Sequence, residues 1–301
     1  MSLAALYDVA APAKLNLFLH VIGRRADGYH LLQSVFVLID WCDRLHFELR
    51  RDGGLARHDL GAVLPADDLC LRAARALQRL SGPALGADIS LDKHVPWGAG
   101  LGGGSSDAAS TLLALNRLWR LHWPRQRLLT LAATLGADVP FFVGGSPAFV
   151  EGIGDELTPL ALPVQRYAVV KPAAALATAD IFGSPALVRD TGAVILSGSF
   201  ASAVLTNGLG DGLGDGLGDG FGRNDLQPVA EARCPEVRQV AEWLQSQFGN
   251  SRMTGSGSAV FARVGTEDPS LATWPAQSLP GPWMARMCCS LDHHPLRDWA
   301  D

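Results

Sequence analysis

Four stretches of the chain place apolar residues at the three- and four-residue spacing of an amphipathic helix. Residues 69–80 repeat Leu and Ala between arginines, and residues 235–248 gather Val, Ala, Leu and Phe on one face. A third pattern, over 108–119, leaves Asn116 and arginines on its other faces. A shorter segment, 127–135, ends at a glycine, the commonest stop signal of a helix. These patterns predict four helices.

Apolar runs bounded by turn residues predict strands between and beside these helices. The expected strands cover residues 13–22, 89–91, 148–150 and 167–170, and another follows a small-residue loop at 252–258. A polar turn at 24–30 leads into an apolar stretch at 35–41. Tyr29 and His30 end that turn, which is either a plain hairpin tip or a loop that presents an aromatic face and an imidazole to a ligand. Alternation alone does not separate the two.

Lys14 and Asn16 interrupt the mostly apolar run at 13–22. In a regular strand these two residues share one face with Phe18 and His20, and the leucines occupy the other. A buried lysine is costly unless an anionic group meets it, whereas a lysine on an edge strand stays in water. The pattern leaves both possibilities open.

Composition narrows the class of protein. The chain has 301 residues, 48% of them hydrophobic, and a formal net charge of −5 without a basic block, so a nucleic-acid partner is not expected. No apolar run approaches the length of a membrane span, and the N-terminus lacks the pattern of a secretory signal. Five scattered cysteines with no CxxC pair indicate reduced thiols, so we expect a cytoplasmic protein that does not bind membranes.

The tetrapeptide Gly-Leu-Gly-Asp occurs three times in tandem between residues 208 and 219. Its aspartates suggest calcium, but the nonapeptide repeat of calcium-binding solenoids is absent. A flexible surface insertion is the expected structure.

Five glycines in the seven positions 98–104 precede Ser105, Ser106 and Asp107. We place these three residues in the first turn of the predicted helix, whose apolar pattern then continues over 108–119. A helix start offers unpaired N–H groups and a partial positive charge, and glycines let a bulky anion reach the backbone. The pattern therefore favours a phosphate-binding loop over an ordinary loop with a serine cap.

Two common phosphate-binding motifs fit this loop poorly. Residues 98–103 match GxGxxG, but no Asp or Glu lies between Asp107 and Asp138, where a dinucleotide fold needs an acidic residue for the ribose. A Walker A loop needs a lysine after its last glycine, and Ser105 stands there. A nucleotide-binding module without catalytic activity remains possible.

The loop at 96–106, Pro-x-x-x-Gly-Leu-Gly-Gly-Gly-Ser-Ser, resembles the ATP loop of the galactokinase, homoserine kinase, mevalonate kinase and phosphomevalonate kinase (GHMP) superfamily. Together with five other motifs in the same order, the chain resembles the 4-diphosphocytidyl-2-C-methyl-D-erythritol kinase family. These motifs are Ala-Pro-Ala-Lys-Leu-Asn-Leu (11–17), Arg-Ala-Asp-Gly-Tyr-His (25–30), Leu-Gly-Ala-Asp-Val-Pro (135–140), Asn-Asp-Leu (224–226) and Thr-Gly-Ser-Gly-Ser (254–258).

The resemblance implies an α+β fold of two domains, with the active site in the cleft between them. The N-terminal domain, 1–152, would carry ATP and the catalytic residues, and the C-terminal domain, 153–301, would be ferredoxin-like and contain the insertion at 208–219. The implied reaction is phosphorylation of the 2-hydroxyl of 4-diphosphocytidyl-2-C-methyl-D-erythritol by ATP with Mg²⁺, in the methylerythritol phosphate route to isoprenoids. The partner is thus a small cytidine diphosphate-linked polyol, and the oligomeric state stays open.

The resemblance also assigns roles to residues. Asp138 would accept the proton of the substrate hydroxyl with Lys14 beside it. The ATP-binding residues would be Pro96, Trp97, Gly98, Ala99, Gly100, Leu101, Gly102, Gly103, Gly104, Ser105 and Ser106. The substrate-binding residues would be Asn16, Tyr29, His30, Thr178 and Phe182, and Gly255, Ser256 and Gly257 would lie close to the phosphates.

Some assignments stay open. Ser106 and Asp107 are only candidates for the magnesium ligands. Asp68 replaces the asparagine usual in the family near the adenine, and an ionised aspartate cannot donate a hydrogen bond, so the adenine contacts are undecided. A mevalonate- or homoserine-type kinase is the alternative within the superfamily.

Overall fold

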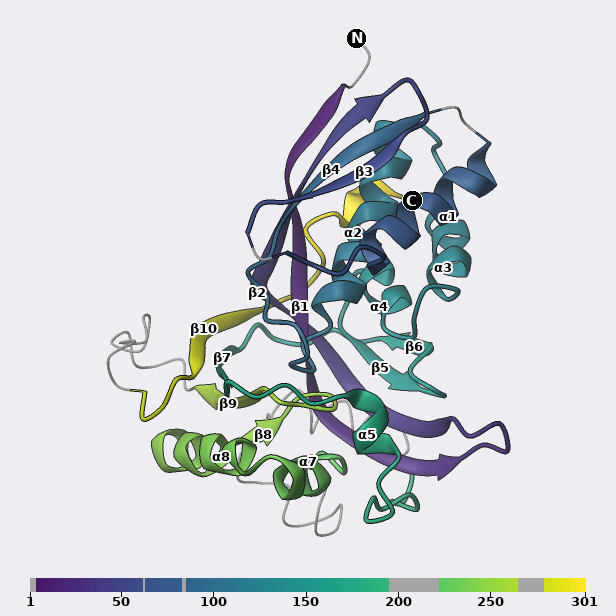
Figure 1. Cartoon of the computed structure of the whole chain (residues 1–301). Helices are drawn as coiled ribbons and strands as arrows, with labels where there is room; N and C mark the ends of the chain where they lie inside the picture. The colour runs from purple at the N-terminus through teal and green to yellow at the C-terminus, as the bar shows by residue number, and fades with distance from the viewer. Residues whose placement is uncertain (1–3, 62, 83–84, 195–221, 265–278) are drawn as a thin grey trace.

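The computed structural model describes residues 4–61, 63–82, 85–194, 222–264 and 279–301. A long hairpin of two strands, β1 (Ala5–Arg24) and β2 (His30–Arg50), runs through the whole molecule (Figure 1). The polar turn at 25–29 is its tip. Because both strands contribute to the packing at either end, they tie the two halves of the molecule together.

The upper half is a mixed sheet covered on one face by helices (Figure 1). Its further strands are β3 (Leu55–Asp59), β4 (Gly86–Asp92), β5 (Ala148–Glu151) and β6 (Glu156–Pro159). Its helices are α1 (Leu69–Ser81), α2 (Gly103–Leu118), α3 (Arg125–Ala132) and α4 (Val139–Gly144). The core of this half forms where leucines of α1 and α2 meet Leu45 and Phe47 of β2.

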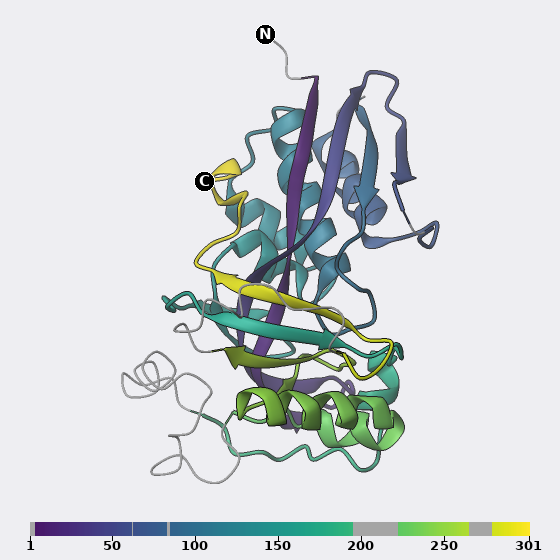
Figure 2. The same ribbon diagram turned by 90° about the vertical axis from the view of Figure 1, so that its left-hand side faces the viewer.

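The lower half is an antiparallel sheet with two helices on one face (Figure 2). Its strands are β7 (Arg166–Lys171), β8 (Arg252–Met253), β9 (Val260–Val264) and β10 (Met284–Leu291). The covering helices are α7 (Gln227–Arg233) and α8 (Pro235–Phe248), and the short helix α5 (Thr178–Phe182) follows β7. The two halves together confirm the predicted α+β class.

One sheet connects the halves, because β10 pairs with β7 along its length and with Leu38 and Ile39 of β2 at its end. The chain then returns to the upper half, where Leu296 lies in the core just before the short helix η4 (Arg297–Trp299). The domain boundary after residue 152 stays a prediction.

A β-bulge in β1 changes the faces that simple alternation predicts. Asn16 pairs with Phe36 and Leu19 pairs with Ser34, so the step from one pair to the next is three residues in β1 but only two in β2. Leu19 consequently faces the same cavity as Lys14 and Asn16, while Phe18 packs into the central core. The expectation that Phe18 shares the face of Lys14 and Asn16 is therefore wrong.

The helices largely follow the predicted pattern, with three differences. Helix α2 begins at Gly103, before the serines. Within this helix Asn116 is buried, and its side-chain amide forms hydrogen bonds with both the N–H and the carbonyl of Trp123. The prediction that Asn116 lies on an exposed polar face is therefore wrong. Helix α3 ends at Ala132, short of the predicted 135. Helices α4, α5 and α7 were not predicted.

The predicted insertion at 208–219 lies outside the described residues. Within the described part of the chain, no helix has the length and apolar character needed to cross a membrane. All five cysteines fall inside the described ranges and are free thiols.

Candidate active site

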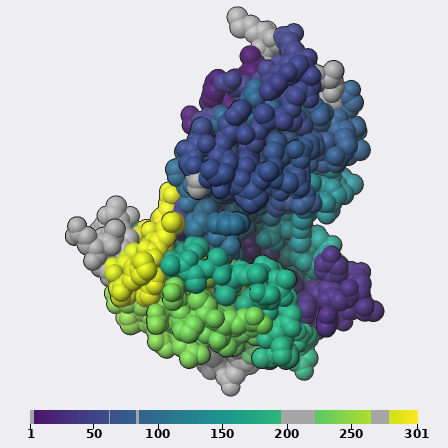
Figure 3. Space-filling view, viewed as in Figure 1, coloured from purple at the N-terminus to yellow at the C-terminus, as the bar shows by residue number. Residues whose placement is uncertain are grey.

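A cavity of about 920 Å³ opens between the two halves, and Figure 3 shows the surface hollowed there beside the purple tip of the β1–β2 hairpin. Its walls come from β1, β2, the glycine-rich loop, the turn before α4, α5 and the loop after β8. It is lined by Lys14, Asn16, Tyr29, His30, residues 96–105, Asp138, Thr178, Phe182, Gly255, Ser256 and Gly257. The structure thus brings together every predicted site residue except Ser106, which is fully buried behind the cavity wall.

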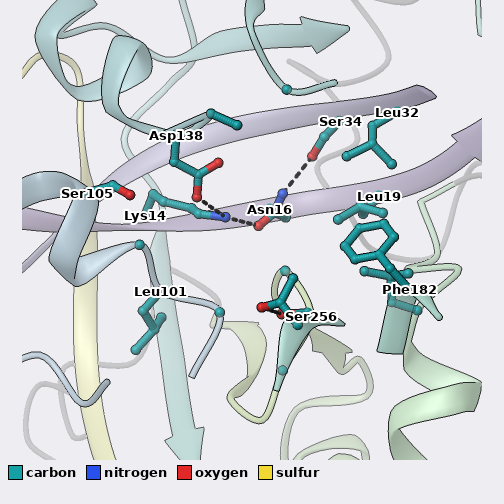
Figure 4. Close-up of a pocket in the computed structure, with 18 of the residues that line it drawn as sticks. Lys14, Asn16, Leu19, Leu32, Ser34, Leu101, Ser105, Asp138, Phe182 and Ser256 are labelled. Carbon is teal, nitrogen blue, oxygen red and sulfur yellow. Dashed lines mark hydrogen bonds and ion pairs between the residues drawn. The ribbon is translucent and has the colours of Figure 1, made fainter. Parts of the chain in front are cut away.

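Lys14 and Asp138 meet on the wall of this cavity (Figure 4). Lys14 Nζ lies 3.6 Å from Asp138 Oδ2 and 4.4 Å from the centre of the Phe36 ring. The lysine side chain is 4% exposed and the aspartate side chain 31%. Burial lowers the pKa of Lys14 below its ordinary value, and the charge of Asp138 opposes that shift. The buried lysine therefore has the anionic partner that its position requires, and an edge-strand location in water is excluded.

Asn16 fixes the lysine from the other side. Its Oδ1 accepts hydrogen bonds from Lys14 Nζ and, at 3.3 Å, from the Thr254 hydroxyl. Its Nδ2 donates to Ser34 Oγ at 3.1 Å. With both ends of the amide engaged, the oxygen of Asn16 is held toward the ammonium group (Figure 4).

The glycine-rich loop interlocks with the loop after β8. Gly100 has φ 74°, and a Cβ placed there would lie 2.1 Å from the carbonyl oxygen of Thr254, so only glycine fits. The Thr254 hydroxyl lies 3.3 Å from the Gly100 carbonyl oxygen, and the amide of Ala259 donates to Ala99 at 3.1 Å. The two loops thus form one continuous wall.

Helix α2 starts at this wall with free backbone donors. Its N-cap is Gly102, with φ 70°, and among the described residues no side chain caps the helix. The uncapped N–H groups and the dipole of a sixteen-residue helix favour an anion at this end. Ser105, in the first turn, lines the cavity.

A buried charge cluster supports the loop from behind. Lys93 Nζ binds the carboxylates of both Asp43 and Asp107, the latter at 2.7 Å, and Asp43 also accepts the amides of His94 and Val95. Burial raises the pKa of Asp107 to about 8, with Lys93 acting against the shift and Asp43 adding to it. Because Lys93 immediately precedes the loop and Asp107 lies in α2, this cluster ties the two ends of the loop together.

The far end of the cavity is aromatic. The Tyr29 side chain is exposed, whereas the His30 ring is partly covered and contacts Phe182, with 5.0 Å between ring centroids. Leu19 and Leu32 line the wall beside Phe182 (Figure 4). Arg189 donates from Nε to His30 Nε2 at 3.0 Å. Burial lowers the pKa of His30, and the charges of Arg189 and Arg24 lower it further.

Comparisons with known proteins agree on one family. A model of the GHMP kinases N terminal domain matches residues 68–146, and one of the GHMP kinases C terminal matches residues 200–272. The 4-diphosphocytidyl-2-C-methyl-D-erythritol kinase of Methylibium petroleiphilum is 64% identical, with all of both chains covered. That of Polaromonas naphthalenivorans is 56% identical over 99% of this chain and 97% of the relative. The chain belongs to the 4-diphosphocytidyl-2-C-methyl-D-erythritol kinase family.

Solved structures agree with that assignment. A crystal structure of a 4-(cytidine 5'-diphospho)-2C-methyl-D-erythritol kinase matches with a TM-score of 0.72 and 35% identity, over 93% of this chain and 98% of that chain. The Methanococcus jannaschii mevalonate kinase shares the fold at a TM-score of 0.65 and 12% identity, over 96% of this chain and 99% of that chain. As a member of this kinase family, the protein is a small-molecule kinase with ATP as its co-substrate, which confirms the predicted class of enzyme.

Asp68, the departure from the family pattern, has structural partners. Its Oδ1 accepts the amide of Leu71 at 3.0 Å, which caps α1, and lies 2.9 Å from Arg57 Nη1. This carboxylate is therefore held at the start of α1, while the next residue, Leu69, lines the cavity.

Several supporting residues were not predicted from the sequence. Arg189 lies 159 positions from His30, and the Thr254 hydroxyl lies 238 positions from Asn16, so no local pattern links either pair. Asp43 and Lys93 pair over a separation of 50 positions. The one available signal was Lys93 itself, a cation directly before the glycine-rich loop.

Proposed function

We propose that this kinase transfers the γ-phosphoryl group of ATP to the 2-hydroxyl of 4-diphosphocytidyl-2-C-methyl-D-erythritol. The observation that carries the proposal is the Lys14–Asp138 pair, 3.6 Å apart, in one cavity with an uncapped helix start and an aromatic end. Phosphoryl transfer asks for positioning and charge neutralisation more than for covalent chemistry by the protein. The cavity offers groups for each of these tasks.

Asp138 serves as the base in this proposal. With its side chain 31% exposed into the cavity, it can reach a substrate hydroxyl and accept its proton as the oxygen attacks phosphorus. Lys14, held by Asn16, points its ammonium group toward Asp138 and stabilises negative charge on the attacking oxygen. The Lys14 ammonium also lies 4.4 Å from the centre of the Phe36 ring, a cation–π contact that favours its charged form.

The triphosphate occupies the glycine-rich loop in this proposal, with its anionic oxygens at the start of α2. Magnesium binds through few protein ligands beside substrate phosphates, so a preformed cage is not required. Ser106 Oγ and Asp107 Oδ1 are buried without a hydrogen-bond partner in the described part of the chain, and both are oxygens suited to a hard cation. Ser106 and Asp107 directly follow the cavity-lining Ser105 and are the candidates that would hold Mg²⁺, and the ion would neutralise phosphate charge.

The cytidine end of the substrate is assigned to Tyr29, His30 and Phe182. An exposed tyrosine and a phenylalanine offer stacking surfaces, and the imidazole offers hydrogen bonding to the base edge. Thr178 and Ser256, whose hydroxyl oxygens are 2.8 Å apart, line the cavity between this end and the glycine-rich loop. Five free thiols support a cytoplasmic location.

The decisive experiment measures ADP release with three alcohols at equal concentration: the cytidine diphosphate-linked methylerythritol, mevalonate and homoserine. We expect turnover with the first only, because the other two offer no base to the aromatic end. Faster turnover of mevalonate or homoserine would contradict the substrate assignment. ATP consumption with none of the three would indicate another alcohol.

Replacing Tyr29 by Ala tests the cytidine site. Loss of one stacking partner should raise KM for the cytidine substrate about tenfold and leave KM for ATP unchanged. Tyr7→Ala is the matched control, because Tyr7 is 62% exposed against 60% for Tyr29 and lies outside the cavity lining. Equal KM values in the two variants would remove Tyr29 from the site.

A further inference from the structure

Arg189 connects the two sides of the aromatic end. Its Nε donates to His30 Nε2 at 3.0 Å. Its Nη2 donates to the carbonyls of Phe182 at 3.0 Å and Ser184 at 2.8 Å, and its Nη1 to that of Leu187 at 2.9 Å. All three guanidinium nitrogens are therefore engaged, and one of them reaches across to the hairpin tip that carries His30.

The chemistry of this contact determines where the imidazole proton lies. A guanidinium has only donors, so His30 Nε2 must present its lone pair to Arg189. A neutral imidazole with a lone pair on Nε2 carries its proton on Nδ1. In the described part of the chain no hydrogen-bond partner is found for that Nδ1, and His30 lines the cavity. Protonation of His30 would place an N–H on Nε2 directly against the Nε–H of Arg189. Burial and the charges of Arg189 and Arg24 lower the pKa of His30, which also disfavours protonation.

We propose that Arg189 is a positioning residue that locks His30 as the Nδ1–H tautomer and so makes the base site selective for cytosine over uracil. The proposal rests on the proposed function, because it concerns the same cytidine site. Cytosine offers acceptors at N3 and O2, whereas uracil carries a proton at N3. A fixed Nδ1–H donor matches the acceptors of cytosine and opposes the N3 proton of uracil. An imidazole that is not fixed can present either a donor or an acceptor, and so can bind either base.

The tautomer is measured first, without any substrate. Nitrogen-15 NMR of the histidine rings, with His30 identified by the signal lost in His30→Gln, should show Nδ1 protonated and Nε2 unprotonated in the wild type. In Arg189→Met, which removes every donor, the ring should shift toward the Nε2–H form. In Arg189→Lys, which keeps a cationic group with donors only, the Nδ1–H form should persist. An Nε2–H wild type, or an unchanged tautomer in Arg189→Met, would overturn the proposal.

The second measurement is selectivity between the cytidine substrate and its uridine analogue. Arg189→Met should raise KM for the cytidine substrate about tenfold, the value of one well-formed hydrogen bond, and reduce its advantage over the uridine analogue by about the same factor. KM for ATP and kcat should stay within about twofold. Arg189→Lys should retain most of the selectivity.

Arg238→Met is the control for loss of an arginine, because Arg238 is 59% exposed and lies on α8 outside the cavity lining. If Arg189→Met raised KM equally for the cytidine substrate, the uridine analogue and ATP, Arg189 would have only a structural role, and the proposal would be overturned. A wild type that phosphorylates a different alcohol refutes the proposed function instead. The NMR measurement still decides the tautomer in that case.

Discussion

At the scale of single residues, the site depends on an acid–base pair with unequal exposure. Lys14 is enclosed, whereas Asp138 is partly open to the cavity, so the aspartate can exchange a proton with a substrate and the lysine cannot easily do so. The proposed roles agree with this difference: in the proposed mechanism the lysine acts as a fixed charge and the aspartate accepts the proton of the substrate hydroxyl.

Asp138→Asn tests the second role. The amide keeps the size of the side chain and removes the base, so kcat should fall by roughly a thousandfold while KM for ATP changes little. The variant Asp292→Asn, at an aspartate with a 70% exposed side chain, should behave like the wild type. Steady-state ADP release measures both. An Asp138→Asn enzyme with near-normal kcat would mean that another group takes the proton.

Lys14→Met separates function from stability. Removing the fixed charge should lower kcat at least about a hundredfold. Burial lowers the folded-state pKa of Lys14 below its ordinary 10.5, so below that pKa the folded protein holds a costly buried charge. The variant should therefore be at least as stable as the wild type at neutral pH. The stability of the wild type should increase relative to that of Lys14→Met as the pH rises toward 10.5. Thermal unfolding of both proteins across this pH range measures the difference. A wild-type advantage that shrinks with rising pH would contradict this sign.

At the scale of elements, the glycine-rich loop and the loop after β8 depend on each other through Gly100. A side chain at this position meets the Thr254 carbonyl and needs a left-handed backbone. The loops come from opposite halves of the chain. Their contact therefore sets the width of the cavity where the triphosphate is proposed to bind.

Gly100→Ala should force these loops apart. We expect a loss of about 2–4 kcal/mol in the free energy of unfolding and an increase in KM for ATP larger than that for the alcohol. Gly144→Ala is the matched control, because among the described residues outside its own stretch of helix no atom lies within 4 Å of the Cβ that would be added there. Denaturant unfolding and steady-state kinetics measure the two effects. A Gly100→Ala protein as stable as Gly144→Ala would show that the loops part without cost.

At the scale of the whole molecule, three hydrophobic clusters form among the described residues, one in the upper half, one in the centre around Phe18 and one in the lower half, and the β1–β2 hairpin supplies residues to each. The C-terminal segment also returns to the upper half, where Arg125 donates to the backbone carbonyls of Arg297 and Ala300. Neither half therefore has a core built only from its own part of the chain. We expect the described elements to unfold together.

Leu296→Ala tests this coupling. Leu296 is 4% exposed in the upper core, so the truncation should cost about 2–5 kcal/mol. Calorimetry should show a single transition that shifts as a whole, whereas Leu80→Ala, at a residue 59% exposed, should shift it little. Two transitions, with only one moved by Leu296→Ala, would instead support independently stable domains at 1–152 and 153–301.

Local patterns in the sequence were sufficient for a large part of this protein. Helix α8 has the predicted bounds 235–248, and α1 extends only one residue beyond the predicted 69–80, because an apolar stripe at helical spacing is a property of neighbouring residues. The glycine-rich loop indicated phosphate for an equally local reason. The ordered motifs identified the family.

Tertiary structure decided the contacts that make the site. The bulge at residues 17–18 of β1 depends on pairing with β2, and it turns Leu19 rather than Phe18 toward Lys14 and Asn16. The approach of Lys14 to Asp138, and of Arg189 to His30, joins residues more than a hundred positions apart. The sequence by itself determined which chemical groups are present and which segments form helices or strands. Only folding determined which groups face one another, because burial, charge and hydrogen-bond direction depend on partners that local periodicity does not record.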